Sequence, residues 1–486
     1  MGGVLSERAQ RWAIFGIALA VRLGIAFVFF GSVDVTNSML DAERLLAGMR
    51  PSELTLPYFP GVQSLIWAAG VVSVGTSIPV AFLYKLGGCV FDSAIAAAIC
   101  DVRGRAAGVL YACAPVPVII VAIHGQWDAI SLAFFITAML MLRRPGRAAA
   151  FVAGALCVLS AIAKPITVPF ILFLFERKRV AALVGGMAAA FAAYVAALWT
   201  VGDPLDVYMV TRVLDYAKTG VTYFGLPHGL GTPENRLVML VPIALLLPLH
   251  WRGRIGREDA ILLSCAWILG TCGLAAQYLS WLVPFLLLKA HLRFAAMYSL
   301  IAGIWLTLFY VTPSVGVEGV NFPNLGAFAP LREMAWLTPA VVIEGAIPDL
   351  MSVAGNFAVP FSCLALIVFL ARRRPAAETP LHAASLAPIA AAVTAAALLI
   401  VAALLLPRPG PDEFRRVTHQ KVQAYNAVPF VSPAARPGEP VWVIPAAVGI
   451  VRASRVHAGT IAILWIVSWS CAAYLTAARK RPYMAT

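Results

Sequence analysis

The polar residues best suited to chemistry in this chain lie at junctions between long apolar segments. Asp34 follows the first of these segments, and His124, Gln126 and Asp128 lie in the short junction HGQWD. Lys164 lies in a later junction, directly before a proline. A carboxylate can accept a proton as a general base, whereas an imidazole, an amide and an ammonium can stabilise negative charge on a leaving group. This combination predicts a site in which a base and charge-stabilising groups act together.

Each of these residues also has a structural interpretation. Asp34 fits a solvated residue just past a helix end, and Asp128 fits the positively polarised N-terminus of the next helix, where the whole HGQWD segment would act as a cap. Lys164 fits a side chain that extends from a helix end to the membrane interface. Tyr278 and Trp281, at a late junction, fit an aromatic belt. Capping alone does not explain a carboxylate, an imidazole, an amide and an ammonium at one level, so we interpret the set as a substrate pocket.

The segments between these junctions place the site in a membrane. The chain is 61% hydrophobic and 12% charged, against about 25% charged residues in a soluble domain, and its mean hydropathy is +0.85. Hydrophobic runs close to the ~20 residues that cross a bilayer recur along the chain. We therefore predict an all-α, polytopic transmembrane helical bundle of about 14 spans with both termini in the cytoplasm. The predicted spans are 12–31, 78–100, 106–123, 128–142, 147–163, 165–176, 180–201, 236–250, 259–275, 279–290, 295–312, 351–371, 385–406 and 456–477.

The formal net charge of +14 reflects loop topology rather than nucleic-acid binding. The basic residues gather in short loops, which is typical of the cytoplasmic side. The loops with the most Arg and Lys lie at 143–147, 177–179, 252–257, 372–374 and 479–481. The eight cysteines are scattered singly and form no zinc-binding pattern. We predict membrane lipids as surroundings, and no nucleic-acid partner, no metal and no cofactor.

Placing the basic loops inside leaves the long connections on the outer face. One apolar stretch, 61–76, lies within the first of these connections. Counting it as a span would invert the basic loops that come after it, so we predict a juxtamembrane or re-entrant helix there.

Two ionisable residues lie deep inside predicted spans. Arg22 is about ten residues from either end of its span, roughly 15 Å at the rise of an α-helix. Asp92 is similarly deep in the second span, and Lys85 precedes it by two turns. Charges inside a bilayer are costly and usually paired. We favour a structural pair between Arg22 and Asp92, with donor-substrate binding by Arg22 as the alternative.

Four segments resemble the polytopic GT-C glycosyltransferases that use polyprenyl-phosphate sugars. They are VDVTNSMLDAERLLAGMRPSELTLPYFPG at 33–61, HGQWDAISLAFF at 124–135, AIAKPITVPFILF at 161–173 and AAQYLSWLVPFLLL at 275–288. Within this family, the chain resembles the bacterial mannosyltransferase-like members and the GPI mannosyltransferase I type. The resemblance covers roughly the first 290 residues. It implies a transmembrane module at 1–201 with a catalytic first outer loop, and a variable transmembrane module at 202–486.

The resemblance also implies an activity and a set of roles. The expected reaction transfers a sugar, with mannose as the expected one, from a polyprenyl-phosphate donor to a lipid, glycan or protein acceptor at the extracytoplasmic face, with inversion. The expected location is a bacterial plasma membrane. Asp34 is the expected catalytic base, with Asp41 as second candidate. The residues expected to bind the donor phosphate are His124, Gln126, Lys164 and Arg22. The residues expected to line the substrate pocket are Tyr58, Asp128, Gln277, Tyr278 and Trp281.

Two other classes of function remain open from the sequence. The segment DVRGR at 101–105 is similar to a signature that major facilitator transporters have between their second and third spans. However, the chain has no repeated halves, and its ionisable residues lie at span ends rather than at the midplane, where transporter sites usually lie. A lipid-linked glycan ligase or flippase would share an outer-face site with the transferase.

Overall fold

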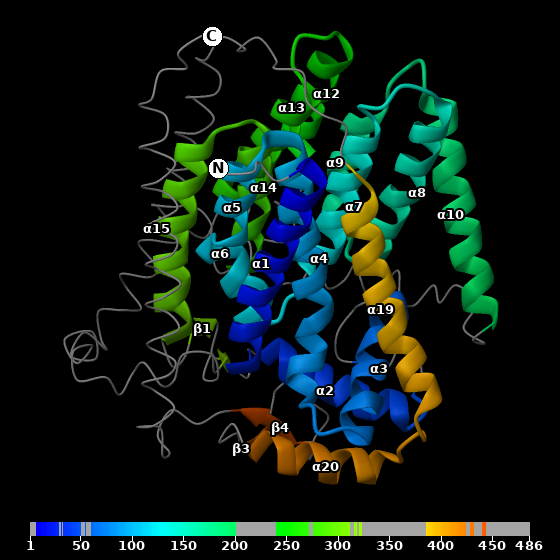
Figure 1. Cartoon of the computed structure of the whole chain (residues 1–486), viewed down its shortest axis with the longest axis vertical. Helices are drawn as coiled ribbons and strands as arrows, with labels where there is room; N and C mark the ends of the chain where they lie inside the picture. The colour runs from blue at the N-terminus through cyan, green and yellow to red at the C-terminus, as the bar shows by residue number, and fades with distance from the viewer. Residues whose placement is uncertain are drawn as a thin grey trace.

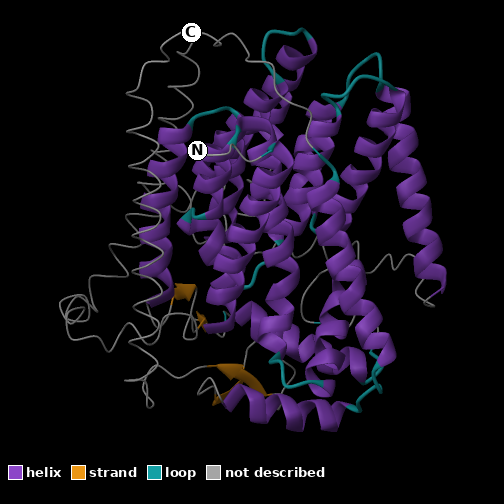
Figure 2. Ribbon diagram, viewed as in Figure 1, coloured by secondary structure: helices purple, strands orange, loops and turns teal. Residues whose placement is uncertain are grey.

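The structure is a computed structural model, and its described part is a bundle of helices that run roughly side by side (Figure 1). It describes residues 6–28, 31, 33–49, 54, 60–200, 240–271, 276–311, 315–317, 320–322, 385–423, 428–431 and 440–443. Within these ranges, two short antiparallel hairpins are the only β structure (Figure 2). One joins β1 (Val315–Val317) to β2 (Val320–Phe322), and the other joins β3 (Val428–Val431) to β4 (Pro440–Val443).

Most helices of the first 200 residues match predicted segments, but α2 was not predicted and the predicted span 165–176 is divided into three short helices. They are α1 (Glu7–Val28), α2 (Val33–Leu46), α3 (Pro60–Gly75), α4 (Val80–Arg103), α5 (Arg105–Ala112), α6 (Pro115–Val118), η2 (Ile119–His124), α7 (Asp128–Met141), α8 (Arg147–Ala163), η3 (Pro165–Thr167), α9 (Val168–Ile171), η4 (Leu172–Leu174) and α10 (Val180–Thr200). The later described helices are α12 (Val241–Trp251), α13 (Arg257–Thr271), η6 (Ala276–Trp281), α14 (Leu282–Leu288), α15 (Leu292–Val311), α19 (Ala387–Leu405) and α20 (Pro411–Gln423).

Several of these helices have the length and composition of membrane spans. Among the described residues, α1, α4, α10 and α19 are long and apolar enough to cross a membrane, and α5 with α6 and η2 makes a fifth span if this pair, bent by 44°, counts as one. Shorter apolar helices occupy most of the other predicted positions. The described part of the chain is thus a helical bundle with segments that could cross a membrane, and the number of 14 stays a prediction. The predicted spans 351–371 and 456–477 lie outside the described residues, and the division of the chain at 201 stays a prediction.

Helix α4 lies at the centre of the bundle. It packs against α1, α5, α7 and α19, and most of its residues are buried. The predicted pair is present in this core: the Arg22 guanidinium lies 2.5 Å from Oδ2 of Asp92. Arg22 also donates to the carbonyl of Ala112 at 2.9 Å, and the Tyr111 hydroxyl donates to Asp92 at 2.6 Å. These bonds satisfy both charged groups of the pair without water.

Helices α8 and α10 pack through two glycines. A methyl group on Gly154 would overlap the carbonyl oxygen of Leu183, and one on Gly186 would overlap the carbonyl oxygen of Phe151. Such backbone contact is typical of membrane helices, because in lipid the association depends on close packing rather than on the hydrophobic effect.

We expect Gly154→Ala to lower the thermal stability of the purified protein in detergent. The new methyl group forces α8 away from α10, and overpacking of this kind costs about 1–3 kcal/mol. Gly16→Ala is the matched control, because a methyl group at Gly16 of α1 meets nothing within 4 Å and alanine favours helix. Equal melting temperatures for the two variants would contradict the expectation.

Three of the basic loops, 143–147, 177–179 and 252–257, lie among the described residues, at one end of the bundle, where ion pairs join them. Arg143 pairs with Glu258 at 2.8 Å, Lys289 pairs with Asp259 at 3.0 Å, and Glu176 joins Arg179 to Arg257. In Figure 1 the α12–α13 turn of this group lies at the top, opposite α2 and α20 at the bottom. The group matches the loops predicted to be cytoplasmic; which side of a membrane it faces stays a prediction.

The connection between α1 and α4, predicted to be an outer one, contains two helices rather than one. The predicted helix at 61–76 corresponds to α3, and α2 precedes it. Helix α2 forms because Val35, Met39, Ala42 and Leu46 recur at helical spacing and are all buried.

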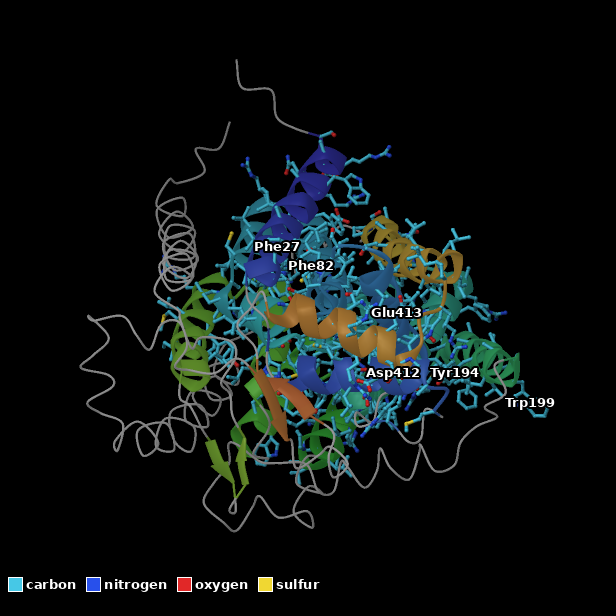
Figure 3. All side chains as sticks on the ribbon, turned by 90° about the horizontal axis from the view of Figure 1, so that it is seen from below. Phe27, Phe82, Tyr194, Trp199, Asp412 and Glu413 are labelled. Atoms are coloured by element: carbon cyan, nitrogen blue, oxygen red, sulfur yellow. The ribbon has the colours of Figure 1, made fainter. Side chains whose placement is uncertain are left out.

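Helix α20 lies across α2 when the molecule is seen from below (Figure 3). Its Phe414 is buried beside Gly70 of α3, and its Arg415 donates to Glu43 of α2 at 3.0 Å. Helix α2 is therefore held from both sides, which fixes the helix that bears Asp34.

Candidate functional site

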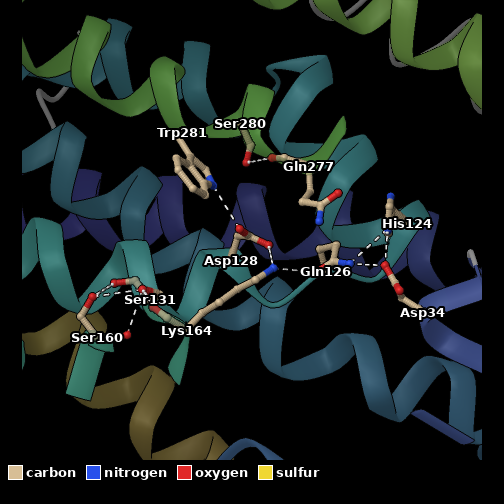
Figure 4. Close-up of polar contacts among 10 residues, drawn as sticks. All are labelled: Asp34, His124, Gln126, Asp128, Ser131, Ser160, Lys164, Gln277, Ser280 and Trp281. Atoms are coloured by element: carbon tan, nitrogen blue, oxygen red, sulfur yellow. Dashed lines mark hydrogen bonds and ion pairs between the residues drawn. The ribbon is translucent and has the colours of Figure 1, made fainter. Parts of the chain in front are cut away.

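Asp34 lies in contact with the HGQWD segment, 90 residues away in the sequence. Its Oδ2 atom is 2.7 Å from Nε2 of His124, and the amide nitrogen of Gln126 donates to the same oxygen (Figure 4). The Asp34 side chain is 22% exposed, so it is mostly but not completely buried. The predicted proximity of the first-loop carboxylate to this junction is confirmed.

Lys164 joins the same network from the other side. Its ammonium donates to Oε1 of Gln126 at 3.0 Å and to Oδ2 of Asp128 at 2.6 Å. The second oxygen of Asp128 accepts the indole N–H of Trp281 at 3.0 Å. Tyr278 lies against both groups, with its ring 5.8 Å from the ammonium and 4.3 Å from the ring of Trp281, centroid to centroid. Asp128 is the first residue of α7, and each of its oxygens accepts a hydrogen bond from a side chain distant in the sequence rather than capping the helix.

The backbone of the HGQWD segment is shaped by a wide helical turn and a glycine. The N–H groups of Gly125 and Gln126 both bond to the carbonyl of Ile120, at 3.1 Å each, a wider turn than that of an α-helix and one often found at functional sites. Gly125 then adopts a left-handed conformation, with φ +85°, and a methyl group there would lie 2.5 Å from Val35 of α2. Glycine therefore satisfies both the backbone turn and the close approach of α2.

Lys164 owes its position to a break between helices. Helix α8 ends at Ala163, and Lys164 is extended, with φ −162° and ψ 128°. Pro165 explains the break, because the residue before a proline is disfavoured in helical conformation. The break turns the lysine side chain away from the helix axis and toward α7.

The surroundings of Asp34 favour its ionised form. Burial raises the pKa of Asp34, but the hydrogen bond and charge of His124, the charge of Lys164 and the hydrogen bond of Gln126 together outweigh burial and hold the pKa below its ordinary value of 3.8. The carboxylate is thus deprotonated at neutral pH and can receive a proton during a reaction.

We expect substitution of His124 by alanine to move the acid limb of the pH–rate profile to higher pH. An activity that needs the Asp34 carboxylate falls as the pH drops through its pKa, and loss of His124 removes two of the causes that lower this pKa. The measurement is kcat/KM against pH for wild type and variant. His124→Gln separates the causes, because it can donate a hydrogen bond but has no charge. An acid limb that stays in place, or moves to lower pH, would contradict this assignment.

Of the other residues predicted for the site, some lie near the network that joins Asp34 to Lys164 and some lie elsewhere in the bundle. Asp41 is fully buried two turns along α2, about 10 Å from Asp34 by helical rise, and lies 3.7 Å from Arg44. Arg22 lies in the pair with Asp92, which confirms the predicted pairing, and donor binding by Arg22 stays a prediction. Gln277 extends toward Gln126 in Figure 4, and its carbonyl accepts the Ser280 hydroxyl at 2.8 Å. Tyr58 lies outside the described residues.

Sequence reasoning missed a set of buried residues next to the site. Trp127 is buried and stacks on Tyr84 with ring centroids 4.9 Å apart. Ser131, Ser160 and Thr167 are fully buried hydroxyl residues around the break at Lys164. Ser131 lies three residues after Asp128, and Ser160 and Thr167 lie four and three residues from Lys164. This spacing could have identified the three hydroxyl residues, because residues three or four apart lie on the same face of a helix.

Among the described residues, no group of three or more His, Cys, Asp or Glu side chains is arranged to hold a metal ion. Metal independence of any reaction stays a prediction. Comparison of the chain with protein-family models, with curated proteins and with solved structures gave no match. The function of the site is therefore inferred from its own geometry and charges.

Proposed function

We propose that this protein is a membrane glycosyltransferase of the GT-C kind that moves a sugar, with mannose expected, from a polyprenyl-phosphate donor to an acceptor hydroxyl at the extracytoplasmic face. The observation that supports this most is the hydrogen-bonded network that joins Asp34 to Lys164 through a single glutamine side chain. A base and a cation one amide group apart suit a reaction that removes a proton from one substrate while negative charge develops on the other.

The proposed step is a single displacement. The acceptor hydroxyl gives its proton to the Asp34 carboxylate as its oxygen forms a bond to the anomeric carbon of the sugar. The bond from that carbon to the phosphate oxygen breaks, and polyprenyl phosphate leaves with the electron pair. Attack from the face opposite the leaving group inverts the anomeric configuration, by analogy with inverting glycoside chemistry. A phosphate leaving group needs charge stabilisation rather than protonation, which is why cations matter more here than a general acid.

Lys164 is suited to bind the leaving phosphate. An ammonium has three donors, and the bonds to Gln126 and Asp128 use two of them. The remaining donor suits a phosphate oxygen. Asp128, itself held by Trp281, fixes the ammonium before the substrate arrives, and such preorganisation is the main source of electrostatic catalysis.

The membrane-facing surface of the bundle supports a lipid-linked substrate. Large apolar side chains are exposed on α10 and α19, among them Phe191 at 48% and Leu398 at 62%. These helices suit a hydrocarbon environment, from which a polyprenyl-linked donor reaches the site by moving within the bilayer.

The DVRGR segment, on which the transporter alternative rests, makes structural contacts within the bundle. In the DVRGR segment, Asp101 pairs with Arg11 of α1 and accepts the backbone N–H of Ser385 at 3.1 Å, while Arg103 donates to the carbonyl of Leu288. These contacts join α1, α4, α14 and the start of α19, so the segment has a structural role that requires no transport.

The proposal is tested with purified protein in liposomes that contain polyprenyl-phosphate mannose labelled in the sugar. A total membrane-lipid and glycan extract serves as acceptor source. We expect release of polyprenyl phosphate and a labelled covalent product only when the extract is present. Movement of the labelled donor between leaflets without a covalent product would indicate a flippase instead, and gradient-driven uptake of a soluble solute would indicate a transporter.

A further inference from the structure

Three buried hydroxyl groups surround the break in the chain at Lys164. Ser131 of α7, Ser160 of α8 and Thr167 of η3 are all fully buried. Thr167 Oγ1 lies 2.6 Å from Ser160 Oγ, the Ser160 hydroxyl donates to the carbonyl of Ser131 at 2.8 Å, and the Ser131 hydroxyl lies 2.8 Å from the carbonyl of Lys164. Figure 4 shows Ser131 and Ser160 beside the backbone of Lys164.

Each hydroxyl has a single hydrogen, which restricts how the cluster is bonded. If Thr167 donates to Ser160, and Ser160 donates to the carbonyl of Ser131, then the Ser131 hydrogen remains for a carbonyl. The carbonyl of Ser160, 2.9 Å from the Ser131 hydroxyl, already accepts the N–H of Lys164 at 3.1 Å. The carbonyl of Lys164 is therefore the better acceptor for Ser131. In this arrangement Thr167 bonds to Ser160, Ser160 bonds to the backbone of Ser131, and the Ser131 hydroxyl bonds to the backbone of Lys164.

This arrangement differs from that of two other buried hydroxyls, Thr137 and Ser93. Thr137 of the same helix bonds to the carbonyl of Ala133 at 2.7 Å, and Ser93 of α4 bonds to the carbonyl of Cys89 at 2.7 Å. Such bonds to the carbonyl four residues earlier are the ordinary way for a helical hydroxyl to be satisfied. Ser131 and Ser160 instead bond across the α7–α8 contact and connect the helix of Asp128 to the break.

We infer that Ser131, Ser160 and Thr167 are positioning residues that fix the backbone of Lys164 and so hold its ammonium between Asp128 and Gln126. The inference rests on the proposed function: by positioning Lys164, the three hydroxyl residues set the affinity of the site for the phosphate of the lipid-linked donor. Substrate contacts belong to Lys164, and the hydroxyls act only through it.

The first test measures the reactivity of the Lys164 amine and needs no catalysis. The full-length protein is labelled with a trace of acetic anhydride, and the acetylation of Lys164 is quantified by mass spectrometry against the exposed Lys178 as internal reference. We expect Ser131→Ala and Thr167→Val to raise the relative labelling rate of Lys164 about fivefold, the factor that corresponds to loss of one buried hydrogen bond. Ser93→Ala, which removes a buried hydroxyl that does not contact Lys164, should leave the rate unchanged.

Thr167→Ser keeps the hydroxyl, and Thr167→Val keeps the shape, so this pair separates hydrogen bonding from packing even if Ser131→Ala does not fold. Labelling of Lys164 at equal rates in these two variants, or at the same rate in Ser131→Ala as in Ser93→Ala, would overturn the inference.

A second measurement connects the cluster to the reaction. We expect Thr167→Val to raise the KM for the polyprenyl-phosphate donor several-fold with little change in kcat, and Thr167→Ser to restore the KM. If the wild-type protein transfers no sugar, the proposed function fails while the labelling experiment still decides whether the hydroxyls position Lys164.

Discussion

Asp34→Asn is expected to reduce sugar transfer by about 10²–10⁴-fold, the range by which general base catalysis accelerates a reaction. Asparagine has nearly the shape of aspartate and can still accept a hydrogen bond from His124 or Gln126, so the site should keep its geometry. The amide cannot take the proton of the acceptor hydroxyl. The loss should therefore appear in kcat for the liposome reaction, with the KM for the donor little changed.

Two further variants make this result specific. Asp412→Asn makes the same change at a fully exposed position of α20, where the side chain is 95% exposed, and should leave transfer unchanged. Asp41→Asn tests the second candidate from the sequence, and because Asp41 is buried beside Arg44, we expect it to lower stability rather than the rate of the folded protein. Near-normal transfer by Asp34→Asn would remove Asp34 as the base. Loss of transfer in His124→Ala alone would then assign that role to His124.

Arg22→Met is expected to destabilise the protein by about 3–5 kcal/mol, because it leaves the buried Asp92 carboxylate without its cation. Asp92 would keep the hydrogen bond from the Tyr111 hydroxyl at 2.6 Å, but an unpaired charge within a membrane-spanning helix is especially costly. The double substitution Arg22→Met with Asp92→Leu should recover most of this loss, since replacing a whole buried pair by apolar residues is often neutral. Thermal or denaturant unfolding in detergent measures each free energy of unfolding.

The matched control is Arg415→Met, which breaks the exposed pair with Glu43 and should cost at most about 1 kcal/mol. A single Arg22 variant as stable as this control would show that the pair contributes little. The double variant also decides the alternative role of Arg22. Recovered stability with normal transfer indicates a purely structural pair, whereas recovered stability without transfer indicates that Arg22 binds the donor.

Much of the local structure was predictable from the sequence. The spacing of apolar runs predicted 147–163 as a helix, which matches α8, and the depth of Arg22 and Asp92 predicted their pairing. The end of the helix at 163 follows from local sequence, because the residue before a proline disfavours helix. The pairing of Arg22 with Asp92 follows from energetic cost, because a charge inside a bilayer needs a partner. The helix at 33–46 was not predicted, because Asp34, Asp41 and Glu43 are typical of a solvated loop, although Val35, Met39 and Ala42 recur at helical spacing.

The amino-acid sequence by itself determined which residue types stand at the helix junctions and that these junctions fall at one end of the bundle. Only the tertiary structure decided which of them meet. Asp128 binds Trp281 from 153 positions away, and the close approach of Val35 to Gly125 brings Asp34 onto His124. Periodicity specifies the face of a helix but not its neighbour, because neighbours are chosen by packing across the whole bundle. The three hydroxyls at Lys164 show the same limit: each is an ordinary buried residue until α7 and α8 are placed side by side.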